Sequence, residues 1–161
     1  MSQGNKASME QPLIQPIQEN LWWVISGKLA GVRKPTAEEL VELKNAGVGA
    51  IVSVFHDSSN LDLYQQAGIS HLWLPIEVNS VPSQKQMQEF ESFVESQNRL
   101  DHAVAVHCST GKHRTGTILA AYLIKSDWSY KDAMRTILDA SSQVELPAAQ
   151  ASFLQSLTDA S

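Results

Sequence analysis

The sequence predicts an α/β fold in which a mostly parallel central sheet is flanked by helices on both faces. Short apolar runs rich in β-branched residues alternate along the chain with segments whose apolar residues recur at helical spacing. Residues 50–55 are apolar apart from Ser53, which is typical of a strand covered on both faces. The length of 161 residues, with 43% hydrophobic and 18% charged residues, fits one globular domain.

The domain organisation follows from composition. Residues 1–15 are rich in Ser, Gln, Asn and Pro and show little periodicity, so we expect a mobile N-terminal tail. Residues 16–161 then form a single domain.

In the first half of the chain, glycines and caps separate the expected elements. Gly27 divides two strand-like runs into a hairpin, and Gly47 and Gly68 end two helices. Thr36 and Glu39 have the spacing of a capping box, which predicts a helix start. The expected elements are strands at 21–25 and 28–31, a helix from the Thr36 cap to 46, a strand at 50–55, a helix at 60–67 and a strand at 70–74.

In the second half, Ser83 and Gln86 form another capping box, and Ser129 caps a later helix. Pro147 has the position of a first-turn proline in the last helix. The expected elements are a helix at 83–98, a strand at 103–106, helices at 115–125 and 129–138, and a final helix beginning at Pro147.

The single cysteine lies between the strand at 103–106 and the helix at 115–125. The residues from 107 to 116 read His-Cys-Ser-Thr-Gly-Lys-His-Arg-Thr-Gly. Backbone N–H groups and the helix dipole concentrate positive charge at such a helix N-terminus, where they stabilise both a phosphate and a thiolate. A cysteine in that position can have its pKa lowered from about 8.5 to between roughly 3.5 and 7.5. We therefore expect Cys108 to be a nucleophile in a phosphate-binding loop.

Four other residues of this loop have expected roles. The planar guanidinium of Arg114 can hold two phosphate oxygens while Cys108 attacks phosphorus from the opposite side. Thr115 can donate its hydroxyl to the cysteine sulfur. His107 is expected to order the loop by hydrogen bonding, because an ionised nucleophile needs no base. Gly111 allows positive φ and close approach to the ligand.

The expected phosphate-binding set is the loop itself. Lys112 and His113 either add cationic character at the rim or belong to a solvated loop surface. The full set consists of Ser109, Thr110, Gly111, Lys112, His113 and Arg114.

This segment resembles the His-Cys-(any five)-Arg-(Ser/Thr) signature of the cysteine-dependent protein tyrosine and dual-specificity phosphatases. The run at 25–31 and the order of the elements are similar to the small atypical dual-specificity phosphatases over residues 20–158. The resemblance implies a phosphatase-like three-layer fold and hydrolysis of phosphate monoesters through a phosphocysteine intermediate. It favours the activity of a protein tyrosine or dual-specificity phosphatase. The Gly-Lys-His-Arg-Thr-Gly stretch is also similar to that of the atypical group that includes inositol pyrophosphate phosphatases. A lysine directly after the glycine, as at Lys112, is a further point of resemblance to the lipid phosphatases of the same superfamily. An inositol polyphosphate, pyrophosphate or phosphoinositide substrate is therefore the alternative.

The general acid is where the sequence departs from the family pattern. The resemblance implies an Asp on the loop at 75–82, but this loop contains no Asp and the expected position holds Val78. Glu77, Glu145 and Asp57 are the candidate acids, and each can equally be read as a solvated surface carboxylate. Without an acid, substrates with good leaving groups, such as aryl phosphates and phosphoanhydrides, are favoured.

Two other classes remain open on the sequence. A rhodanese-like sulfurtransferase also places a cysteine in a loop before a helix, although Arg114 fits a phosphate better. A non-catalytic phospho-binding module would account for the missing Asp.

Composition excludes several partners. A net charge of −5 argues against nucleic acid, and a single cysteine excludes an internal disulfide, which suits a reducing compartment. No apolar stretch reaches the roughly 18 residues of a membrane span, and the five histidines show no metal-ligand spacing. We expect a cytoplasmic enzyme without a metal or cofactor, acting on a phosphorylated protein or a small phosphorylated substrate; the sequence does not predict its oligomeric state.

Overall fold

The structure is a computed structural model of the 161-residue chain. It describes residues 16–77, 80–108, 113–142, 144, 146 and 148–159, without the side chains of residues 113 and 159. The predicted tail at 1–15 and the predicted first-turn position of Pro147 lie outside these residues.

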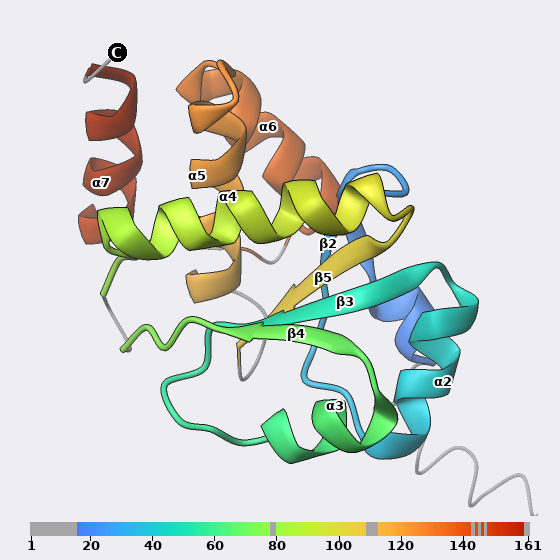
Figure 1. Cartoon of the computed structure of the whole chain (residues 1–161). Coiled ribbons are helices and arrows are strands. Elements are labelled where there is room, and N and C mark those ends of the chain that lie inside the picture. Colours follow the sequence, from blue (N-terminus) through green and yellow to red (C-terminus); the bar gives the residue numbers. More distant parts are fainter. Residues whose placement is uncertain are drawn as a thin grey trace, which may run out of the picture.

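The centre of the fold is a five-stranded sheet with the order β1-β2-β5-β3-β4. The β1–β2 hairpin is antiparallel, whereas β2, β5, β3 and β4 run parallel to one another (Figure 1). This mixed, mostly parallel sheet confirms the predicted fold class. The strands are β1 (Trp22–Ile25), β2 (Leu29–Gly31), β3 (Val48–Ser53), β4 (Ser70–Trp73) and β5 (Ala103–His107).

Helices cover both faces of the sheet (Figure 1). The first face is covered by η1 (Ile17–Asn20), α2 (Ala37–Asn45) and α3 (Leu61–Ala67). The opposite face is covered by α4 (Gln84–Arg99), α5 (His113–Lys125), α6 (Tyr130–Ala140) and α7 (Ala148–Asp159).

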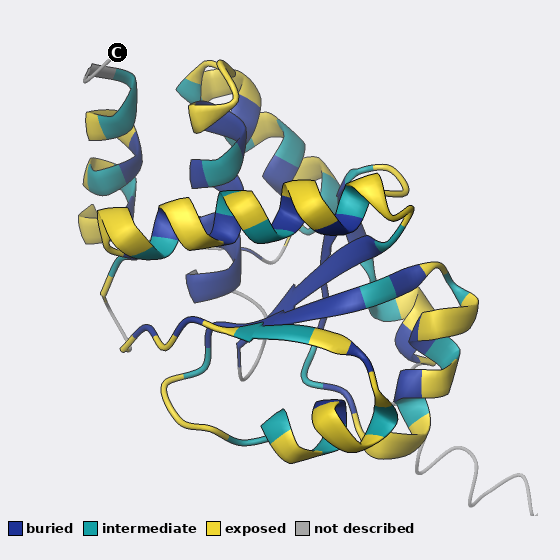
Figure 2. Cartoon of the chain, in the orientation of Figure 1, coloured by how far each residue is buried: buried dark blue, intermediate teal, exposed yellow. Residues whose placement is uncertain are grey.

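Strand β5 shows why both faces are needed. Val104 and Val106 belong to the hydrophobic core under α4 and α5, whereas Ala103 and Ala105 belong to the core on the α2 and α3 side. Alternate residues of a strand point to opposite faces, so an apolar run without polar alternation must be covered twice. Figure 2 shows this central strand buried along its length.

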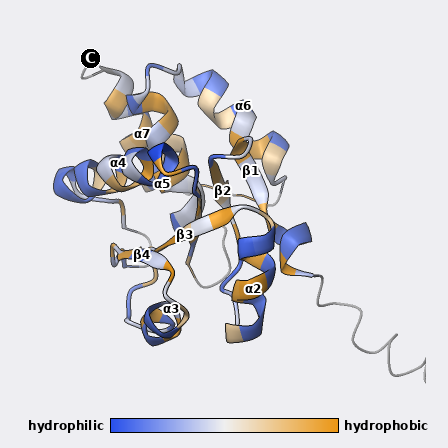
Figure 3. Cartoon of the chain, turned by 45° about the vertical axis from the view of Figure 1, so that its right-hand side comes forward, coloured by the Kyte–Doolittle hydropathy of each residue, from blue (hydrophilic) through white to orange (hydrophobic). Residues whose placement is uncertain are grey.

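Local capping signals set the helix starts as predicted. In α2, Thr36 and Glu39 make both reciprocal bonds of a capping box, and Ser83 and Gln86 do the same at α4. Ser129 accepts a hydrogen bond from a backbone N–H in the first turn of α6. Figure 3 shows hydrophilic and hydrophobic residues interleaved along α2, α4 and α6, as expected for helices with one face in the core.

Two element boundaries differ from the sequence prediction in ways that matter for the site. Strand β3 covers Val48–Ser53, so it begins and ends two residues earlier than the expected strand at 50–55. Helix α5 begins at His113 and not at Thr115. The apolar periodicity starts only at Ile118, and therefore it cannot reveal a polar first turn. As a result, Arg114 lies within the first turn of α5.

Candidate active site

The signature segment begins at the carboxyl end of the central strand β5. The neighbouring strand ends hold it from both sides, because Val32 N–H donates to the Val106 carbonyl (3.0 Å) and Val54 N–H donates to the His107 carbonyl (2.9 Å). Cys108 follows directly and is 2% exposed. Cys108 is thus fixed at the carboxyl-terminal end of the parallel strands, on the side where α5 begins.

His107 is the centre of a buried hydrogen-bond network. Its Nδ1 lies 3.0 Å from the Cys108 carbonyl oxygen, and its Nε2 lies 2.6 Å from the Tyr64 hydroxyl. A carbonyl only accepts, so Nδ1 carries the proton and Nε2 accepts from Tyr64. Asn60 Nδ2 in turn donates to the Tyr64 hydroxyl (3.0 Å) and to the Pro35 carbonyl (2.8 Å).

The protonation states in this network follow from burial. The pKa of His107 is lowered to about 4, mainly by burial; the hydrogen bond to the Cys108 backbone opposes this shift, and the positive charge of Lys34 adds a smaller lowering. Burial also raises the pKa of Tyr64 above its ordinary value. At neutral pH, His107 is therefore a neutral imidazole that donates to the Cys108 backbone, and Tyr64 is a phenol that can donate. This arrangement supports an ordering role for His107.

Arg114 lies in the first turn of α5 and is 7% exposed. One guanidinium nitrogen, Nη1, donates to the Ile76 carbonyl at 2.9 Å, and the guanidinium carbon lies 5.5 Å from the centroid of the Phe55 ring. Phe55 follows β3 and Ile76 follows β4. Arg114 therefore joins the signature segment to two loops at the same edge of the sheet.

Thr115 is completely buried next to Arg114, and its Oγ1 has no hydrogen-bond partner among the described residues. A buried hydroxyl without a partner is unfavourable by about 1–3 kcal/mol, so such a group commonly has a functional partner. The predicted hydrogen bond to the Cys108 sulfur is not formed in this structure, and it would supply the missing partner.

Two contacts bring the C-terminal region to the site, and sequence reasoning missed both. A Cβ on Gly116 would lie 2.7 Å from Val144 Cγ1, so any larger residue would force Val144 to shift away from the first turn of α5. Gln150 of α7 is 1% exposed, and its Nε2 donates to the Ser80 carbonyl at 3.1 Å. Neither contact has a local signal, since each joins segments far apart in the sequence.

The candidate acids differ in their surroundings. Glu77 is exposed and directly follows Ile76, whose carbonyl binds Arg114. Asp57 is exposed, and its carboxylate accepts hydrogen bonds from the Ser59 backbone N–H (2.9 Å) and the Ser59 hydroxyl, which lower the pKa of the Asp57 carboxyl. That shift disfavours the protonated form that a general acid requires.

The remaining predicted residues lie partly outside the described chain. Those outside it are Val78, Ser109, Thr110, Gly111, Lys112 and Glu145. The backbone of His113 begins α5. Among the described residues, no group of three or more His, Cys, Asp or Glu side chains is placed to hold a metal ion. The helices within the described ranges include none with the length and apolar character needed to cross a membrane.

A buried cysteine after a central parallel strand, with an arginine in the first turn of the following helix, is the site architecture of the cysteine-dependent phosphatases. Residues 26–127 match the family model described as "Polymorphic toxin system, DSP-PTPase phosphatase" (Tc-R-P). The chain belongs to this family, which confirms the resemblance to the dual-specificity phosphatases.

Relatives of known name agree with this assignment. The chain is 36% identical over 106 residues to the tyrosine-protein phosphatase yvh1 of Schizosaccharomyces pombe, covering 63% of this chain and 31% of that protein. It is 29% identical over 94 residues to the human phosphatidylglycerophosphatase and protein-tyrosine phosphatase 1, covering 57% of this chain and 47% of that protein. The chain thus matches less than half the length of these relatives.

Solved structures share the fold. The crystal structure of Tk-PTP in the active form aligns with a TM-score of 0.78 and 26% identity, covering 87% of this chain and 97% of Tk-PTP. Human DUSP28 aligns with a TM-score of 0.73 and 22% identity, covering 91% of this chain and 98% of DUSP28. The second likeness concerns the fold alone.

Proposed function

We propose that this protein hydrolyses phosphate monoesters through a phosphocysteine intermediate and acts as a protein tyrosine or dual-specificity phosphatase. The observation that carries the proposal is the junction of β5 and α5, where Cys108 is buried at the strand end and Arg114 occupies the first helical turn. In this geometry a phosphate at the helix N-terminus meets the thiol and the guanidinium together.

In the first step, the Cys108 thiolate attacks phosphorus, a P–S bond forms and the P–O bond to the leaving group breaks. Arg114 holds the phosphoryl oxygens, and the leaving oxygen takes a proton from an acid or from water. In the second step, water attacks the phosphocysteine and the P–S bond breaks; inorganic phosphate leaves with the protons of that water, and the thiolate is regenerated. Thr115 would donate its hydroxyl to the sulfur in both steps, while His107 holds the Cys108 carbonyl in place.

Cys108→Ser tests the nucleophile. The alcohol is not ionised at neutral pH, so turnover of an aryl phosphate should be lost, while binding of a tetrahedral phosphate analogue such as tungstate should largely persist. Substantial hydrolysis by the Cys108→Ser protein would refute the phosphocysteine mechanism. Retained phosphate-analogue binding without turnover by the wild type would instead identify a phospho-binding module, and cyanide-dependent thiosulfate turnover would identify a sulfurtransferase.

The acid can be assigned through leaving-group dependence. Glu77 is the first candidate, and its position directly after Ile76, whose carbonyl accepts from Arg114, supports it. Rates should be measured over a series of aryl and alkyl phosphates for the wild type, Glu77→Gln, Glu145→Gln and Asp57→Asn. Replacing the true acid should steepen the fall in rate with leaving-group pKa and flatten the basic limb of the pH profile. A shallow dependence in the wild type that none of the three replacements steepens would mean that another residue is the acid, or that water or the substrate supplies the proton.

A lipid or inositol phosphate is the second candidate substrate. One relative is named both a phosphatidylglycerophosphatase and a protein-tyrosine phosphatase, at 29% identity. Comparing kcat/KM for phosphotyrosine peptides, phosphoinositides and inositol polyphosphates would decide between the two classes.

The cellular setting is part of the same proposal. A single cysteine that serves as a thiolate nucleophile works only where thiols stay reduced, which supports a cytoplasmic location. We further propose that residues 16–161 form one catalytic domain that needs no metal or cofactor.

A further inference from the structure

Lys34 is a second cation beside the proposed phosphate site. It lies on the loop between β2 and α2 and is half-buried. Its Nζ lies 5.1 Å from the centroid of the Phe55 ring, and the guanidinium carbon of Arg114 lies 5.5 Å from the same centroid. The two cations are therefore separated by no more than these two distances together. A single small molecule with two anionic groups can span such a separation.

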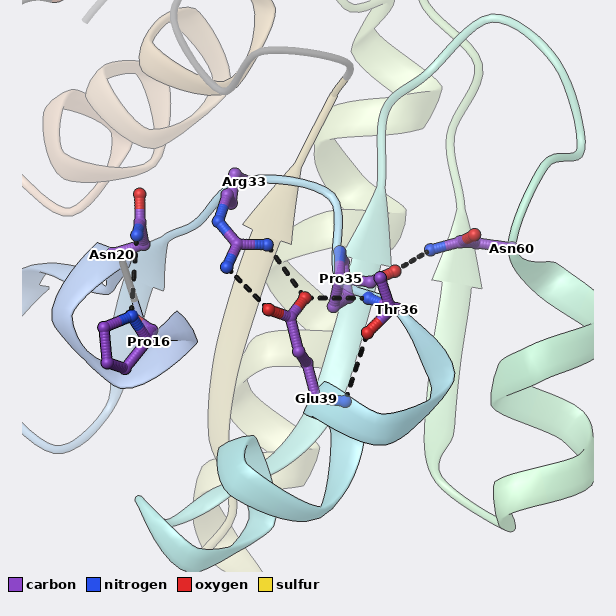
Figure 4. Close-up of polar contacts among 7 residues, drawn as sticks. All are labelled: Pro16, Asn20, Arg33, Pro35, Thr36, Glu39 and Asn60. Atoms are coloured by element: carbon purple, nitrogen blue, oxygen red, sulfur yellow. Dashed lines mark hydrogen bonds and ion pairs between the residues drawn. The ribbon is translucent and has the colours of Figure 1, made fainter. Parts of the chain in front are cut away.

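The loop that carries Lys34 is held in place on both sides of it. Arg33 makes two hydrogen bonds with the Glu39 carboxylate (2.8 and 2.6 Å), and the Pro35 carbonyl accepts from Asn60 Nδ2 at 2.8 Å (Figure 4). The backbone on either side of Lys34 is thus fixed before any ligand arrives. A preorganised group loses less conformational freedom on binding.

The neighbouring carboxylates do not neutralise this ammonium by contact. Glu39 is paired with Arg33, and Asp57 accepts its hydrogen bonds from Ser59. Within the described part of the chain, no acceptor lies within hydrogen-bond or ion-pair distance of Lys34 Nζ. Its charge nevertheless reaches the site, because it contributes to the lowered pKa of both His107 and Asp57.

We propose that Lys34 is a specificity-determining residue that binds a second anionic group of the substrate, a carboxylate or phosphate close to the phosphate held by Arg114. This inference rests on the proposed phosphatase function and names the class of substrate for it. The Phe55 ring lies close to both cations, and an aromatic face attracts cations, so the ring helps to hold the Lys34 ammonium near Arg114. Phosphate esters with a neighbouring negative group are then preferred over esters without one.

A matched pair of aryl phosphates tests the role of charge alone. The 3-carboxyphenyl and 3-carbamoylphenyl phosphates have nearly the same shape, but only the first carries a second anion. Wild type should prefer the carboxylate about tenfold in kcat/KM, mainly through KM, as expected for one partly screened charge pair. Lys34→Gln should abolish this preference, Lys34→Arg should keep most of it, and the exposed control Lys28→Gln should leave it at the wild-type ratio.

Failure of the inference and failure of the proposed function give different results. If neither ester is hydrolysed by wild type, the function is wrong. If wild type hydrolyses both esters at equal kcat/KM, or if Lys34→Gln lowers both by the same factor, the function stands and the role of Lys34 is overturned. Asp57→Asn provides a test of opposite sign, because removing a nearby negative charge should increase the carboxylate preference.

Two further pairs identify the source of the anion. The first pair is a phosphotyrosine peptide with Asp or Asn beside the phosphotyrosine, and the second is a small polyol with two neighbouring phosphates or with one. A preference that disappears in Lys34→Gln assigns the site to acidic phosphopeptides in the first case and to small polyphosphates in the second. A preference that depends on Lys34 in neither pair overturns the inference.

Discussion

The two ends of the signature segment are held in opposite ways. His107 is fully buried and neutral. On the α3 side of the sheet, Tyr64 hydrogen-bonds to it and Asn60 hydrogen-bonds to Tyr64. Arg114 is permanently charged, and it is held by the Ile76 carbonyl and the Phe55 ring from two loops. The difference shows that the backbone around Cys108 is fixed from within the core, whereas the charge proposed to bind the phosphate is positioned by the loops that follow β3 and β4.

The largest effect is expected on the charged side. Arg114→Lys keeps the charge but loses the planar pair of donors and the bond geometry toward Ile76, so kcat/KM should fall by roughly 10²- to 10³-fold. Steady-state kinetics with an aryl phosphate measures this. Thermal stability should change far less than activity, and a variant with near wild-type kcat/KM would contradict the assigned role.

On the neutral side, the expected effect is on stability against pH. The pKa of His107 is lowered from 6.5 to about 4, so the unfolded chain binds a proton in this window and the folded chain does not. The contribution of His107 is present above pH 6.5 and is lost as pH falls toward 4, by about 3 kcal/mol. Urea unfolding between pH 7 and pH 4 should show this loss, and His107→Gln should reduce the slope.

The salt bridge of Arg33 provides an internal comparison for that experiment. The hydrogen bonds with Arg33 hold the pKa of Glu39 at about 2, so the Glu39 contribution is present above pH 4.5 and is lost only as pH falls toward 2. The two windows overlap only between pH 4.5 and 4, and Glu39→Gln should therefore leave the slope between pH 6.5 and 4.5 in place. A slope that disappears in Glu39→Gln would reject the assignment to His107.

Tyr64→Phe should produce a smaller effect on the neutral side. It removes the hydroxyl that meets His107 Nε2 and leaves that buried acceptor without its partner, which lowers the free energy of unfolding by about 1–3 kcal/mol. Chemical denaturation measures the change. The pKa of His107 followed by NMR should rise in this variant, because the lost hydroxyl donates to the neutral imidazole, and it should stay unchanged in the control Tyr130→Phe, a partly buried residue at the start of α6 on the other face of the sheet. Unchanged stability would mean that the network does not hold His107.

The smallest effect is expected at the loop before α4. Gln150→Met removes the hydrogen bond to the Ser80 carbonyl but keeps a buried side chain of similar size, so unfolding should change by about 1 kcal/mol or less. Because this bond ties the loop that follows Ile76 to α7, kcat should fall severalfold while phosphate-analogue affinity stays close to wild type. Equal loss of both would place Gln150 in phosphate binding.

The sequence by itself determined the features that depend on neighbours in the chain. Capping boxes at Thr36 and Ser83 marked helix starts because their partners lie three residues away. Residues 107–116 indicated a phosphate-binding nucleophile because strand, loop and helix are consecutive. The first turn of α5 was missed, since its polar residues have no apolar periodicity.

Only the tertiary structure decided which distant groups surround that segment. Tyr64 reaches His107 across 43 residues, Arg114 reaches Ile76 across 38, and Gln150 reaches Ser80 across 70. The cause is the strand order, which places β2 and β3 on either side of β5 and thereby brings their following loops to one edge. A strand's own residues specify its period and burial but not its neighbours, so these contacts, and the position of Lys34 against Phe55, could be known only after the sheet was assembled.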